Sequence, residues 1–164
     1  MLRLPHPEVA ALLDPIKRDV IRIEQPTVAD TALSYAVFRS EADTPDLAFY
    51  DTDGTIYIPE DLVQFDEQYA QLIALHEHVE IQHKRASRPH AYAHRRALIA
   101  EFLAAKRIFS EPGQLERYLH WRIGLYPESK RFDRADVLAQ LVHILAAERP
   151  RKGDLFQVIK AHPL

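Results

Sequence analysis

The sequence predicts an α+β fold in which a small antiparallel sheet with a β-hairpin packs on a mainly helical layer. Helix-compatible and strand-compatible segments occupy about the first 60 residues, an Asp-Gly pair marks a hairpin, and only helical periodicity follows. Strands and helices do not alternate along the chain, so a parallel sheet built from βαβ units is not expected. With 164 residues and no internal repeat, the chain is most simply a single domain over residues 1–164.

The elements expected before residue 60 are a helical run, a strand, a polar loop and the two strands of a hairpin, at residues 7–23, 31–38, 41–46, 47–50 and 55–58. Pro15 lies within the helical run and lacks a backbone N–H, so this run is either one kinked helix or two short ones. The hairpin prediction depends on Asp53 and Gly54, because an Asp-Gly pair readily adopts the positive φ that tight turns require.

The helices expected after residue 60 cover residues 62–83, 90–109, 115–123 and 133–147. The second of these helices contains six alanines, whose small side chains allow close approach to a neighbouring element. The tail at residues 151–164 fits either a strand or a short helix.

Composition narrows the range of partners and ligands. The net charge of -3 and the pI near 6.3 argue against nucleic acid as the main partner, since phosphate binding requires a concentrated basic face. No apolar stretch approaches the roughly 20 residues of a membrane span, and the N-terminus lacks the apolar core of a signal peptide, so we expect a cytoplasmic protein without a membrane partner. Because the chain has no cysteine, a bound metal would have only nitrogen and oxygen ligands.

Polar side chains interrupt the apolar face of the helix expected over residues 62–83. His76, Glu80 and His83 fall on one helical face, which also carries Tyr69 and Leu72 and should therefore point inward. Buried ionisable groups cost several kcal/mol unless they are paired, and a metal ion is one such partner. We therefore predict a metal site on this helix, with His83 better explained as a cation at the carbonyl end of the helix.

The next helix repeats this inward polarity. His94 and Glu101 share a face with Ala97, which makes both residues candidates to complete the site. Two other interpretations stay open. One is a buried hydrogen-bonded network without metal, and the other is a ferritin-like di-iron bundle, because Glu80 and His83 form an E-x-x-H unit. The sequence contains no second E-x-x-H unit, which argues against the bundle.

The central motif, residues 76–80, reads H-E-x-x-E. A hydrolytic zinc site needs two ligands one helical turn apart, a third ligand from elsewhere, and a carboxylate that takes a proton from the attacking water. In H-E-x-x-H the two histidines are the ligands and the glutamate is the base. In this chain a carboxylate, Glu80, stands where that motif has its second imidazole.

The motif and the segment before it resemble zincin metallopeptidases. Tyr50-Asp51 and Ile56-Tyr57-Ile58, separated by a turn and followed by the H-E-x-x-E helix, look like the hairpin and metal helix of the small ImmA/IrrE-like group. The motif together with Ala93-His94 and Glu101 is also similar to phage-type proteins. The resemblance covers about residues 47–101 and implies a zincin-like fold.

The resemblance implies an intracellular metal-dependent hydrolase, a peptidase in which His76 and Glu80 are metal ligands and Glu77 is the general base. The third ligand is either His94, which we favour, or Glu101, which would otherwise be a fourth ligand or an outer partner. Two imidazoles and one carboxylate suit zinc, whereas one imidazole and two carboxylates would suit manganese or iron(II) better.

A peptide or protein substrate follows from the same resemblance. In that family the strand that contains Tyr57 lies at the edge of the site, where it can hold a peptide by β-augmentation. Tyr92 is a candidate donor to an oxyanion opposite the metal. The alternative function is a non-catalytic zincin-fold binding or regulatory protein with a structural or vestigial metal site. Glu77 argues against this alternative, because a site that has lost its catalytic activity needs no general base.

Overall fold

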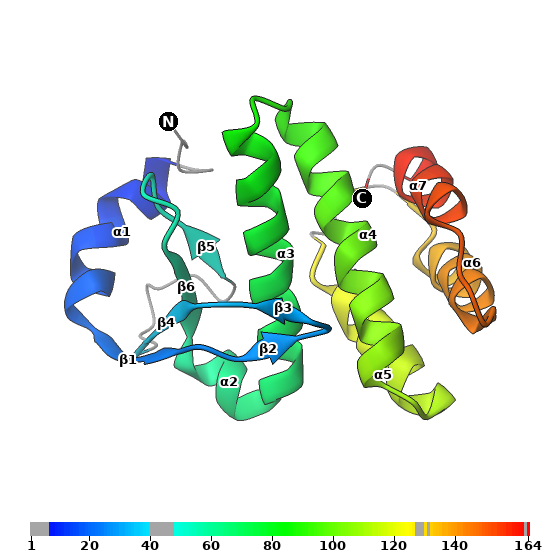
Figure 1. The fold of residues 1–164 in the computed structure, drawn as a ribbon, viewed down its shortest axis with the longest axis horizontal. Coiled ribbons are helices and arrows are strands. Elements are labelled where there is room, and N and C mark those ends of the chain that lie inside the picture. Colours follow the sequence, from blue (N-terminus) through cyan, green and yellow to red (C-terminus); the bar gives the residue numbers. More distant parts are fainter. Residues whose placement is uncertain (1–6, 40–47, 127–129, 131, 163) are drawn as a thin grey trace. The chain divides into compact units, whose positions relative to one another are not determined.

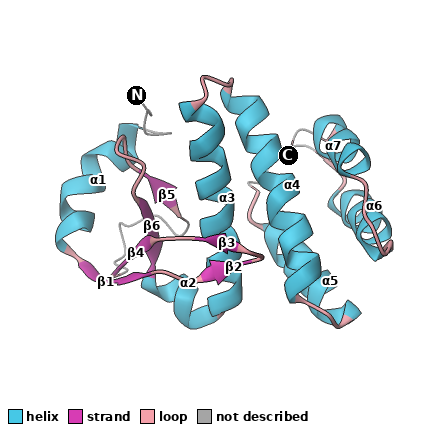
Figure 2. Cartoon of the chain, in the orientation of Figure 1, coloured by secondary structure: helices cyan, strands magenta, loops and turns pink. Residues whose placement is uncertain are grey.

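The computed structural model describes residues 7–39, 48–126, 130, 132–162 and 164. The chain forms two compact units, Met1–Ala97 and Leu98–Leu164, whose boundary falls inside helix α4 (His90–Ile108). All strands of the described residues belong to the first unit, and the second unit is helical (Figure 1, Figure 2). The predicted α+β class is therefore confirmed.

The sheet of the first unit is mixed, so the prediction of an antiparallel sheet is wrong for its central pair. The strand order is β1-β4-β6-β5, formed by Val20–Glu24, Tyr35–Phe38, Ile56–Pro59 and Phe49–Tyr50. The hairpin β5–β6 is antiparallel, as predicted, but β6 rather than β5 lies beside β4, and these two strands run parallel. All four residues of β6 are buried, so this longer apolar strand takes the inner position and leaves the two-residue β5 at an edge of the described sheet.

Two elements near the N-terminus differ from the prediction. Helix α1 (Pro7–Arg18) is shorter than the expected run, because the β-branched segment Val20–Glu24 pairs with β4 instead of extending the helix. The strand expected over residues 31–38 is divided, and its first part belongs to a small second sheet. The strands of that sheet are β2 (Thr27–Val28) and β3 (Thr31–Ala32). The polar loop expected at residues 41–46 lies outside the described residues.

The main sheet lies between α1 and α3 (Glu67–Arg85) within the first unit (Figure 1). On one face, α1 contributes to a buried cluster made of Ile16, Ala36, Phe38, Phe49 and Tyr57. Because side chains alternate between the two faces along a strand, Tyr50 points away from this cluster, and its hydroxyl contacts Glu80 of α3. The alternation therefore brings a strand side chain to the helix that carries the H-E-x-x-E motif.

Asp66 divides the single helix expected over residues 62–83 into two. Its carboxylate accepts hydrogen bonds from the backbone N–H groups of Gln68 (2.9 Å) and Tyr69 (3.2 Å), which caps the start of α3. The short helix α2 (Glu60–Phe65) precedes this cap. As a result, the whole H-E-x-x-E motif lies in one regular helix.

The second unit contains the C-terminal half of α4 and, among the described residues, α5 (Pro112–Gly124), α6 (Arg134–Ala146) and α7 (Lys152–Ala161). Helices α5 and α6 agree with the predicted helices at residues 115–123 and 133–147. The tail at residues 151–164, for which a strand and a short helix were both expected, forms the helix α7. Each helix buries apolar side chains, among them Phe102, Leu119, Leu141 and Ile159.

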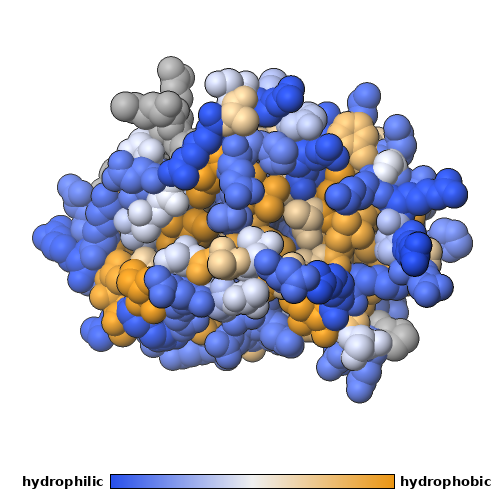
Figure 3. All heavy atoms as spheres, viewed as in Figure 1, coloured by the Kyte–Doolittle hydropathy of each residue, from blue (hydrophilic) through white to orange (hydrophobic). Residues whose placement is uncertain are grey.

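The face seen in Figure 3 is mostly hydrophilic. No helix in the described ranges is both long and apolar enough to span a membrane.

Gly54 in the β5–β6 turn should not tolerate a side chain. Its φ of +82° lies in the left-handed region, and an added Cβ would overlap the guanidinium of Arg85, which donates to the Asp53 carbonyl at 2.8 Å. Gly54→Ala should therefore lower the free energy of unfolding, measured in urea, by about 1–2 kcal/mol. Gly153→Ala is the control, since a Cβ there meets no atom within 4 Å. Equal losses in both variants would contradict this explanation.

Candidate metal centre

Three side chains from α3 and α4 converge within the first unit. His76 and Glu80 lie one turn apart on α3, and His94 comes from the N-terminal half of α4. Each residue offers one ligand atom, and these atoms all lie within 4.8 Å of one another. His76 and Glu80 are buried and His94 is partly buried. In the described part of the chain, this is the group of histidine and acidic side chains that could hold a metal ion.

The distances from the two imidazoles to Glu80 are compatible with ligands of a tetrahedral ion. Nε2 of His76 lies 3.4 Å and Nδ1 of His94 lies 3.3 Å from the same atom, Oε2 of Glu80. Both are long hydrogen bonds, since the usual N–H···O distance is roughly 2.7–3.2 Å. They match the separation of about 3.4 Å that tetrahedral geometry imposes on ligands bonded at about 2.1 Å. The three residues thus have the chemistry and the spacing of a metal ligand set.

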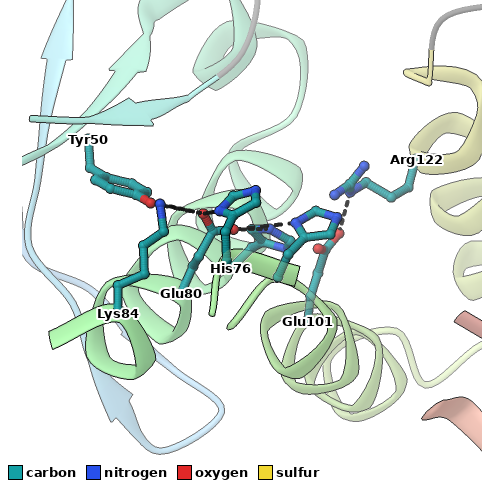
Figure 4. Close-up of polar contacts among 8 residues, drawn as sticks. Tyr50, His76, Glu80, Lys84, Glu101 and Arg122 are labelled. Carbon is teal, nitrogen blue, oxygen red and sulfur yellow. Dashed lines mark hydrogen bonds and ion pairs between the residues drawn. The ribbon is translucent and has the colours of Figure 1, made fainter. Parts of the chain in front are cut away.

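The other oxygen of Glu80 has a separate set of neighbours. The Tyr50 hydroxyl donates to Oε1 at 2.9 Å, and Nδ1 of His90 and Nζ of Lys84 lie 3.5 and 4.0 Å from the same atom. Figure 4 shows the Tyr50 hydroxyl pointing toward Glu80 and the end of the Lys84 side chain, which comes from α3, lying beside it. Each carboxylate oxygen of Glu80 therefore faces a different group of side chains.

The surroundings of Glu80 keep its carboxylate ionised. Burial alone would raise the pKa of Glu80, but hydrogen bonds with His76, His94 and Tyr50 and the charge of His76 outweigh burial and lower this pKa. The pKa of Tyr50 is raised by burial, by the charge of Glu80 and by the hydrogen bond to it. Tyr50 thus keeps its proton and acts as the donor, while the Glu80 carboxylate carries a negative charge.

Glu77 directly follows the first candidate ligand on α3 and is partly buried. Its negative charge contributes to the raised pKa of Tyr50, which places the carboxylate within electrostatic reach of the hydroxyl that contacts Glu80.

The other two histidines of α3 lie outside this group. His83 lies in the last turn of α3, as expected, and its ring contacts that of Tyr92 with a centroid distance of 5.5 Å. His78 is only partly buried, and burial and the charge of Arg85 lower its pKa.

Glu101, the alternative third ligand, forms a buried ion pair within the second unit. Its Oε1 accepts hydrogen bonds from the Tyr118 hydroxyl at 2.5 Å and from Nε of Arg122 at 2.7 Å. Burial alone would lower the pKa of Arg122, but the charge of Glu101 raises it, so the guanidinium remains charged. The structure therefore groups His94, and not Glu101, with His76 and Glu80.

The two residues expected to bind substrate, Tyr57 and Tyr92, contact other side chains of the first unit. Tyr57 is buried in the cluster beneath α1, where its hydroxyl donates to Asp51 at 3.2 Å, and burial and Asp51 raise its pKa to about 12. Its strand β6 pairs with β4 on one side and with β5 on the other, and Tyr57 itself lies opposite Phe49 of β5. Tyr92 accepts a hydrogen bond from Nε of Arg96 at 3.2 Å, and the guanidinium groups of Arg88 and Arg96 lie 5.5 Å from its ring centroid.

Tyr50 is the neighbour of the site that sequence reasoning missed. The alternation of Phe49 and Tyr50 along a strand predicts that these two aromatic rings point to opposite faces. Which of the two faces α3 depends on the register between the hairpin and the helix. That register cannot be predicted from the local sequence.

The chain was also compared with protein families, with curated protein sequences and with solved structures. None of these three comparisons gave a match. The chemistry of the site is therefore inferred from its own residues.

Proposed function

We propose that this protein is a metal-dependent hydrolase with a zincin-like centre that cleaves peptide bonds. The observation that carries the proposal is the convergence of two imidazole nitrogens, from His76 and His94, on one oxygen of Glu80. Two histidines and one carboxylate form the ligand set of catalytic zinc sites that keep a fourth position open. Iron(II) and manganese are the alternative metals, because both also accept imidazole and carboxylate ligands.

The chain supplies the remaining parts of a hydrolytic site. When bound, a divalent ion provides Lewis acidity, which lowers the pKa of water and polarises a carbonyl group. His76, Glu80 and His94 hold the ion, and Glu77 accepts the proton of the attacking water on its carboxylate. The resemblance of the H-E-x-x-E helix and its hairpin to zincins supports a peptide as the substrate.

Glu77→Gln is the variant that tests this function. Elemental analysis should find about one equivalent of metal in both the purified wild-type protein and the variant, because Glu77 is not a ligand. Hydrolysis of a mixed library of quenched fluorescent peptides should fall at least about 100-fold, since the variant lacks the general base. Glu67→Gln, on the exposed first turn of α3, is the matched control. A wild-type protein without stoichiometric metal, or an unchanged rate in Glu77→Gln, would refute the proposal.

A second candidate function is a non-catalytic binding module with a structural metal. The observation that favours it is His90, whose ring stacks on His94 with a centroid distance of 6.0 Å and could supply a fourth nitrogen. A site closed by four protein ligands would have no position for water. In that case His90→Ala should weaken metal binding, and no peptide in the library should be cleaved.

A further inference from the structure

We propose that Tyr50 is a positioning residue that orients the Glu80 carboxylate so that Oε2 alone is presented to the metal. This inference rests on the metal centre of the proposed function. Tyr50 comes from the sheet, whereas the three proposed ligands come from helices. Its proposed role is to determine how the Glu80 carboxylate binds the metal.

The two oxygens of the Glu80 carboxylate have different partners. Oε2 faces the two imidazoles, at 3.4 Å from His76 and 3.3 Å from His94. Oε1 accepts a hydrogen bond from the Tyr50 hydroxyl at 2.9 Å, which is the shortest of these distances and within the range of ordinary O–H···O hydrogen bonds. Nδ1 of His90 also lies near Oε1, at 3.5 Å. A carboxylate whose Oε1 accepts the Tyr50 hydrogen bond is held from rotating Oε1 toward His76 and His94.

Tyr50 is itself fixed in place. Its side chain is 1% exposed, and its strand β5 pairs with β6 through the Tyr50↔Ile56 register. The ammonium group of Lys84 lies 5.4 Å from the centre of the Tyr50 ring, in the range of cation–π contacts, and 4.0 Å from Oε1 of Glu80. The phenol therefore approaches Glu80 from a rigid support.

The orientation of the Glu80 carboxylate determines how many coordination positions of the ion are filled by the protein. A carboxylate that binds through both oxygens fills two positions, whereas one that binds through Oε2 alone fills one. With His76 and His94, the second arrangement leaves a position of a tetrahedral ion open for water. Tyr50 would thus favour a catalytic centre over a closed one.

Tyr50→Phe tests this role against Tyr57→Phe. The two tyrosines lie on the same hairpin and are both buried, but the Tyr57 hydroxyl donates to Asp51 and not to Glu80. Competition with a chromophoric chelator should show that Tyr50→Phe binds zinc about 10–100-fold more weakly than wild type. The visible band of the cobalt(II)-loaded variant should also lose intensity, as expected for a higher coordination number. Tyr57→Phe should keep both the affinity and the spectrum.

The outcomes separate this inference from the proposed function. A wild-type protein that binds no zinc would remove the metal centre and the inference together. If wild type binds zinc but Tyr50→Phe and Tyr57→Phe have equal affinities and spectra, the centre stands and the role of Tyr50 is refuted. Should Tyr50→Phe fail to fold, the zinc-minus-apo infrared difference spectrum of wild type decides. A wide splitting of the carboxylate bands supports binding through one oxygen, and a narrow splitting overturns the inference.

Discussion

His76→Ala is expected to abolish stoichiometric metal binding. The variant loses one of the three ligand atoms, and the remaining pair, Glu80 and His94, provides too few donors for a stable site. The loss in affinity should exceed the roughly 10–100-fold that follows removal of an outer partner of a ligand. Elemental analysis after purification and zinc titration of the metal-free protein both measure this effect.

Thermal unfolding gives a second readout of the same change. A ligand that binds only the folded state stabilises it, by about 4 kcal/mol at 1,000 times its dissociation constant. Zinc should therefore raise the unfolding temperature of the wild type and leave that of His76→Ala unchanged. His78→Ala is the control, because His78 lies on the same helix outside the ligand group. Equal zinc responses in the two variants would show that the ion binds elsewhere.

Glu101→Gln should cause the largest loss of stability. Glu101 is 0% exposed and forms its ion pair with Arg122, which is itself buried. Removing one partner of a buried pair leaves an uncompensated charge and costs about 3–5 kcal/mol. The free energy of unfolding of a domain is only about 5–15 kcal/mol, so urea denaturation should show a greatly lowered midpoint.

Two further variants make this result specific. Glu116→Gln, on the exposed surface of α5, should leave the midpoint nearly unchanged. Glu101→Leu combined with Arg122→Met should recover much of the loss, because apolar side chains of similar size can replace a buried ion pair. Glu101→Gln should also retain its metal, since His94 and not Glu101 belongs to the ligand group. A stable Glu101→Gln protein without metal would make Glu101 a ligand instead.

Local sequence determined the elements of this protein more completely than their arrangement. Periodicity predicted α3 and the i, i+4 relation of His76 and Glu80, because both depend only on the geometry of one helix. The Asp53-Gly54 pair similarly predicted the β5–β6 hairpin, since the turn requires a positive φ at Gly54. These features follow from interactions between residues that are close along the chain.

Tertiary structure decided the features that depend on residues far apart in sequence. The face of α4 that carries His94 also carries Glu101, and periodicity alone could not choose between them. The choice follows from their partners: Arg122 and Tyr118 engage Glu101, whereas His76 and Glu80 lie beside His94. The parallel pairing of β4 with β6 arises in the same way, because long-range packing places the longer strand of the hairpin inside the sheet. The H-E-x-x-E helix could therefore be predicted from the sequence, but the grouping of His94 with His76 and Glu80 and the Tyr50 contact required the fold.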